Sequence, residues 1–125
     1  MNVIERAHRA YAPTTSPIRT GRATELQLFG RATARLKAAV ASAPYDMPAL
    51  AAALHDNRRI WIHMAAEVAD RNNALSEDLR ARLFYLSEFV GYQTRKALKG
   101  QGGVASLIEV NTAVMRGLTG QGGGE

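Results

Sequence analysis

The chain contains no cysteine in its 125 residues, which excludes a disulfide framework and a thiolate metal site. Aromatic residues are few: one tryptophan, four tyrosines and three phenylalanines. Much of the 46% hydrophobic content is alanine, which favours close helix packing over a β-sandwich. No apolar run approaches the ~20 residues needed to span a bilayer, and residues 1–11 lack the apolar segment of a signal peptide. We therefore expect a cytoplasmic protein that does not enter the membrane.

The charge is moderately basic, with a formal net charge of +5. Such a balance raises the expectation of an acidic partner. Basic and acidic residues are interleaved, however, and no run of five or six like charges occurs. Most of these side chains are therefore expected on the solvated faces of helices.

Hydrophobic spacing predicts an all-α protein, a small four-helix bundle. Apolar residues recur in steps of three and four, and the breaks between these stripes fall at proline, asparagine and glycine. The expected helices run over about 22–42, 47–70, 77–99 and 104–118. Asp46 and Ser76 are predicted N-caps, and Gly100 is expected just past the end of the third helix.

The chain is expected to hold one helical domain, residues 21–118, between two less ordered ends. A short amphipathic helical arm in residues 1–20 carries Val3, Ile4 and Tyr11 and leads into a linker that begins at Pro13. Residues 119–125 are rich in glycine and are predicted to form a disordered tail.

The second helix carries the longest stripe in the chain. Its members share one helical face and include the only tryptophan: Met47, Leu50, Leu54, Asn57, Trp61, Met64 and Val68. Trp61 is expected in the core, although with Met64 it could instead line a groove. Asn57 interrupts this apolar stripe and must therefore be hydrogen-bonded. The same holds for Asn111 in the fourth helix, whose predicted buried face comprises Val104, Ile108, Asn111, Met115 and Leu118. Each asparagine is expected to secure a neighbouring helix end or loop; the alternative is a seam position that selects a partner.

The third helix is apolar over more than one stripe. Its core stripe comprises Leu79, Leu83, Leu86, Val90, Gln93 and Ala97. A second line, Tyr85, Phe89 and Tyr92, runs along an adjacent face. This line is either covered by the fold or left as a surface for a partner helix, because aromatic residues recur at such surfaces.

Candidate catalytic chemistry is sparse. His63 and Glu67 lie four residues apart on one face, with Asp70 three further on, and could suggest a metal or acid–base site. A second histidine at matching spacing is missing, so an exposed polar helix face is the preferred interpretation. The sequence has neither a phosphate-binding glycine loop nor a nucleophile elbow. We expect a protein that is not an enzyme and binds no metal or cofactor.

The order of several residues resembles the FlaF family of flagellar biosynthesis regulators. The resemblance covers about residues 24–118 and rests on Asn57-x-x-x-Trp61, Asp70-x-x-Asn73-x-Leu75, Leu79-Arg80-x-x-Leu83 and Ile108-x-x-Asn111-x-x-x-Met115-x-Gly117-Leu118. Family members often have proline where this chain has Ser76 and leucine where it has Ile60. The residues that match the family pattern are expected to be mainly structural: Asn57, Trp61, Asn73, Leu75, Arg80, Asn111, Met115 and Leu118.

The resemblance implies a cytoplasmic helical protein that binds flagellin before export, supports flagellum assembly and works alongside the regulator FlbT. We expect Tyr85, Phe89 and Tyr92 to contribute a groove for the amphipathic terminal helices of flagellin. The N-terminal arm around Val3, Ile4 and Tyr11 would cover the groove when it is empty. The alternative is a nucleic-acid-binding regulator of flagellin synthesis. Its candidate contacts are Arg58, Arg59, Arg80 and Arg82.

Overall fold

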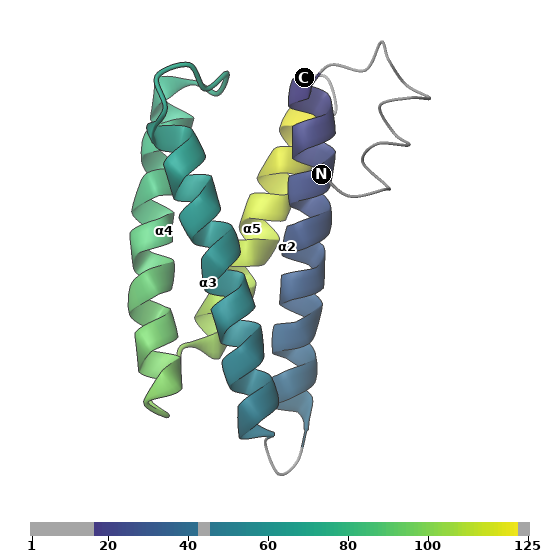
Figure 1. Cartoon of the computed structure of the whole chain (residues 1–125), viewed down its shortest axis with the longest axis vertical. Helices are drawn as coiled ribbons and strands as arrows, with labels where there is room; N and C mark the ends of the chain where they lie inside the picture. The colour runs from purple at the N-terminus through teal and green to yellow at the C-terminus, as the bar shows by residue number, and fades with distance from the viewer. Residues whose placement is uncertain (1–16, 43–45, 123–125) are drawn as a thin grey trace.

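Four helices follow one another up and down the structure, a computed structural model that describes residues 17–42 and 46–122, with side chains for 23–42 and 46–117 (Figure 1). They are α2 (Pro17–Ala41), α3 (Met47–Ala69), α4 (Glu77–Leu98) and α5 (Val104–Gly122). Within the described residues there is no strand, which confirms the all-helical prediction. None of the described helices is long and apolar enough to cross a membrane.

The helices pack in a ring, so that each one contacts its neighbours in the order α2, α3, α4, α5 and α2 again. The interface between α4 and α5 is the smallest of the four. Figure 1 shows these two helices close together at the lower end, where a short joint links them, and diverging towards the other end. Because the two helices diverge, α5 covers less of α4 towards that end.

The start of α2 differs from the prediction, because the helix begins at Pro17 and not near Arg22. The predicted linker beginning at Pro13 therefore does not extend to residue 20. A proline is well suited to the first helical position, since its fixed φ fits the helix and its missing N–H would be unpaired there anyway. Val3, Ile4 and Tyr11 lie outside the described residues. At the other end α5 continues to Gly122, and the predicted tail stays a prediction.

The predicted helix caps of α3 and α4 are confirmed. Asp46 accepts a hydrogen bond from the Ala49 backbone N–H at 3.1 Å, and Ser76 accepts one from that of Leu79 at 3.2 Å. Gly100 has φ +73° and follows the end of α4. Its N–H donates to the Ala97 carbonyl at 3.0 Å. The neighbouring Gln101 N–H reaches Lys96 O at 2.9 Å, which completes a Schellman motif.

The core lies along the shared axis of the four helices and follows the predicted stripes closely. In α3 the members from Leu50 to Val68 are buried, whereas Met47, the first residue of the helix, is 51% exposed. In α5 the deepest residues are Leu107, Asn111 and Val114, while Val104, Ile108 and Met115 are half-buried. The buried face of α5 is therefore rotated from the predicted one, because this helix contacts both α2 and α4.

Candidate partner-binding surface

A chain of hydrogen bonds in the interior joins three helices and holds the bundle in register. Trp61 Nε1 donates to Asn111 Oδ1 at 2.9 Å. Asn111 Nδ2 donates to Asn57 Oδ1 at 2.7 Å and to Thr33 Oγ1 at 3.1 Å. The Trp61 ring also meets Phe29 edge to face, with centroids 5.3 Å apart.

These contacts place Trp61 in the core, as expected, with 1% of its surface exposed. They also correct the expected role of the asparagines. Asn57 and Asn111 bond to one another and connect α2, α3 and α5 in the middle of the bundle, so they do not secure a helix end or loop. A mid-helix amide can do this because the three helices meet closely enough for side chains to pair directly.

The turn between α3 and α4 is held by residues of the family pattern. Asn73 Nδ2 donates to Glu67 O at 3.1 Å, and Asn73 Oδ1 accepts from the Leu75 N–H at 2.9 Å. Arg80 Nη1 reaches back to Asp70 O at 2.9 Å. Leu75 and Met115 are half-buried and pack against the core. The side chain of Leu118 lies outside the described residues.

Exposed apolar side chains gather on α4. Among the described residues, seven large hydrophobic side chains are exposed, and four of them belong to this one helix: Phe84, Tyr85, Tyr92 and Leu98. The other three, Leu28, Met47 and Ile62, are spread over α2 and α3. Burying surface of this kind is favourable, so a concentration on one helix indicates an interaction surface.

Two of the three residues in the predicted aromatic line are exposed, and the third is half-buried. Tyr85 is 70% exposed and Tyr92 is 53% exposed, whereas Phe89 is half-buried. Lys96 lies over the Tyr92 ring, with Nζ 5.7 Å from its centroid. The two tyrosines, seven residues apart, share one face of α4. The structure thus leaves this face open to a partner, and its role in binding stays a prediction.

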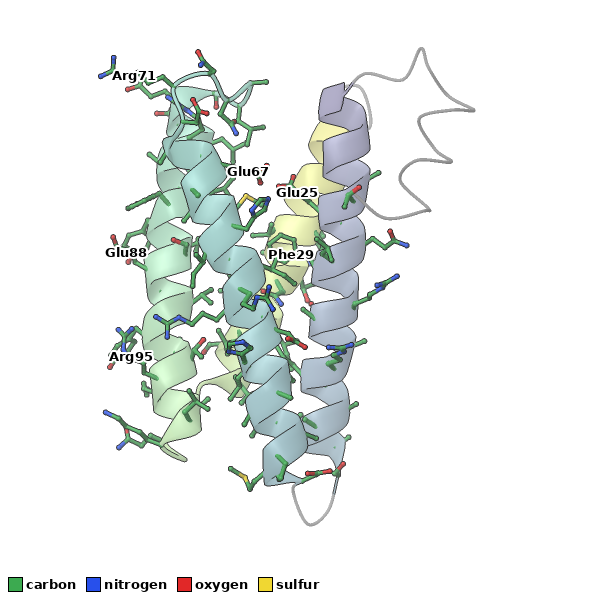
Figure 2. All side chains as sticks on the ribbon, in the orientation of Figure 1. Glu25, Phe29, Glu67, Arg71, Glu88 and Arg95 are labelled. Atoms are coloured by element: carbon green, nitrogen blue, oxygen red, sulfur yellow. The ribbon has the colours of Figure 1, made fainter. Side chains whose placement is uncertain are left out.

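A groove on the other side of α4 was not anticipated from the sequence. It lies between α3 and α4, has a volume of about 330 Å³ and is lined by Arg58, Trp61, Ile62, Ala65, Ser87, Glu88, Val90, Gly91 and Arg95. Figure 2 shows Glu88 and Arg95 on the outer side of α4. Phe84 and Leu98 share a face with Gly91, at intervals of seven residues. Ile62, an isolated large apolar residue off the core stripe of α3, was the available sequence signal.

The remaining candidate residues do not assemble into a site. His63 Nε2 and Glu67 Oε1 are 3.7 Å apart on the surface, and the described residues contain no group of three potential metal ligands. Arg58 and Arg59 lie in the middle of α3, about 18 Å along the helix from Asp70 at its end. Arg80 is committed to the Asp70 carbonyl. Arg58 and Arg59 therefore lie apart from the turn that holds Arg80, and contact of these arginines with nucleic acid stays a prediction.

Together these features define a small helical-bundle protein. Hydrogen-bonded polar side chains lie in its core, and exposed apolar side chains are concentrated on α4. The chain belongs to the FlaF family: the family described as flagellar protein FlaF matches residues 7–118. This match confirms the resemblance found in the motif order. Comparison with curated proteins and with solved structures gives no match.

Proposed function

We propose that this protein binds flagellin in the cytoplasm before export, as a secretion chaperone and regulator of flagellum assembly. Membership of a flagellar family supports the context. The observation that carries the proposal is the gathering of four exposed large apolar side chains on α4. A protein that shelters an amphipathic helix needs such a surface, because the apolar face of that helix must be covered until assembly.

The proposal describes a binding protein rather than an enzyme. The interior polar groups Asn57, Asn111 and Thr33 are buried and bond to one another, so they hold the fold and do not face a substrate. Among the residues with described side chains no titratable residue is fully buried, and His63 lies on the surface beside a half-buried Glu67. Binding to flagellin therefore depends on surface complementarity, with an aromatic helix face as its anchor.

The direct test is calorimetric titration of the full chain with purified monomeric flagellin from the same organism. The expected result is saturable binding with one protein per flagellin. Replacing the exposed tyrosines in the double variant Y85S/Y92S should weaken binding at least tenfold, because both rings would lose buried contact area. The matched control is L28S/M47S, which removes two exposed apolar side chains from α2 and α3.

The outcomes separate the function from the location of its surface. Absence of any heat of binding with the wild-type chain would refute flagellin binding. Binding that survives in Y85S/Y92S as well as in L28S/M47S would keep the function and move its surface away from the two tyrosines. Circular dichroism of both variants should remain helical, since all four positions are exposed.

A further inference from the structure

The α3–α4 groove lies over buried apolar residues of the core and has one exposed apolar side chain, Ile62, beside it. Trp61 and Val90 come from the two facing helices and lie almost fully buried beneath it, and Ala65 beside them is half-buried. Gly91 contributes no side chain to the lining, and the Arg95 guanidinium lies beside the position that a Cβ would take. A volume of about 330 Å³ accommodates a large aliphatic or aromatic side chain from another molecule.

Two arginine side chains border this apolar space without a partner of their own. Among the described residues neither Arg58 nor Arg95 forms an ion pair or a side-chain hydrogen bond. Arg95 Nη1 lies 3.5 Å from the position that a Cβ of Gly91 would occupy, so its guanidinium reaches over the groove. Glu88 is the only carboxylate in the lining, which leaves an excess of positive charge. Guanidinium groups beside an apolar surface favour a carboxylate ligand.

The shape of the surrounding surface favours a helical occupant. Phe84, Gly91 and Leu98 follow one another at seven-residue intervals on α4, and Phe84 and Leu98 are exposed beyond the two ends of the groove. This strip is about 21 Å long, the length of four turns of helix. Residues spaced in this way match the contact stripe of a second helix laid along α4.

We propose that the α3–α4 groove seats an amphipathic helix of the partner protein, which inserts an apolar side chain over Gly91 and directs an acidic side chain to Arg58 and Arg95. The inference rests on the proposed function, in which that helix belongs to flagellin. It adds a second contact surface to the Tyr85–Tyr92 face, namely the groove and the Phe84–Leu98 strip on the other side of α4. It also states the chemistry of the partner: one large apolar residue with a carboxylate within about one turn.

The test compares variants of the full chain titrated with purified monomeric flagellin from the same organism. Gly91→Leu fills the groove, and the ideal Cβ meets only Arg95 Nη1 at 3.5 Å, an ordinary contact. It should weaken binding at least tenfold. The matched control is Gly30→Leu in α2, a helical glycine with no atom within 4 Å of its Cβ position, which should bind like the wild type.

Charge is tested separately from shape. R58E/R95E should weaken binding at least tenfold, whereas R31E/K37E, with the same change in net charge on α2, should have less than a threefold effect. Equal losses in the two charge variants would overturn the carboxylate pairing, since they would report only overall charge.

Three results would overturn the groove as the binding site. One is unchanged flagellin binding by both Gly91→Leu and R58E/R95E while the wild type binds; the proposed function would then stand without the groove. Another is sedimentation showing a wild-type dimer that Gly91→Leu converts to a monomer, because the occupant would then be a second copy of this chain. The third is absence of flagellin binding by the wild type, which ends the proposed function itself.

Discussion

Asn111 is the residue on which the interior hydrogen bonds converge. Its amide bonds to Trp61, Asn57 and Thr33, and all three partners are buried. Replacing it by leucine keeps the side-chain volume but leaves the Trp61 N–H and the Asn57 carbonyl oxygen without partners. Asn111→Leu should therefore lower the free energy of unfolding by about 2–4 kcal/mol, measured by urea denaturation.

Asn57 provides the matched comparison for this prediction. Its Oδ1 accepts one bond from Asn111, but its buried Nδ2 has no hydrogen-bond partner. Asn57→Leu breaks a single bond and removes an unpaired donor, so the loss should stay below about 2 kcal/mol. Equal losses in the two variants, or a larger loss for Asn57→Leu, would contradict the central role of Asn111.

Gly103 is required by both conformation and space at the joint between α4 and α5. Its φ is +105°, and a Cβ would lie 2.8 Å from Gln93 O. Gly103→Ala should lower the free energy of unfolding by about 2 kcal/mol or more, because backbone strain and a steric clash add. Gly102, with φ +82° and open space around its Cβ position, is the control and should lose about 1 kcal/mol. Similar unfolding curves for the two variants would show that the close approach to Gln93 is unimportant.

At the scale of elements, the turn between α3 and α4 fixes how these two helices are joined. Asn73 satisfies the Glu67 carbonyl at the end of α3 and the Leu75 N–H beyond it. Asn73→Ala should lower the free energy of unfolding by about 1–2 kcal/mol and speed amide exchange in the turn. Asn72→Ala should stay within about 0.5 kcal/mol, since that side chain is exposed. A null effect at Asn73 would mean that the turn is held by Arg80 and backbone contacts alone.

The helices themselves could be predicted because each carries a stripe with one dominant period. Leu50, Leu54, Trp61 and Val68 are buried as their spacing indicates. The start of α2 lies earlier than predicted, because proline is common both in linkers and at the first position of a helix, and Pro17 begins the helix. The buried face of α5 was misplaced because Leu107 and Val114 are selected by contacts with two helices at once, which a single stripe does not show.

The surface was harder to predict than the core. The apolar excess of α4 followed from Tyr85 and Tyr92, which lie outside its core stripe. The α3–α4 groove did not follow, because its lining alternates between two helices and its volume depends on how closely they approach. A glycine such as Gly91 has no sequence pattern that distinguishes open space from close packing.

At the scale of the whole molecule, side-chain hydrogen bonds connect helices in the interior, and exposed apolar side chains are distributed unevenly over the exterior. The network around Asn111 ties α2, α3 and α5 together, whereas the apolar surface lies mainly on α4. Stability and binding therefore depend on different residues. Variants of Asn111 or Gly103 should act through the folded fraction, and variants of Tyr85 or Gly91 through affinity alone.

Hydrogen exchange of the full chain with and without purified flagellin tests this division most directly. If flagellin binds along α4 and the α3–α4 groove, amides of α4 and of the facing part of α3 should exchange more slowly in the complex. The exchange of amides in the middle of α2 should not change. Protection confined to α2 and α5, or no difference in exchange at saturating flagellin, would contradict the account.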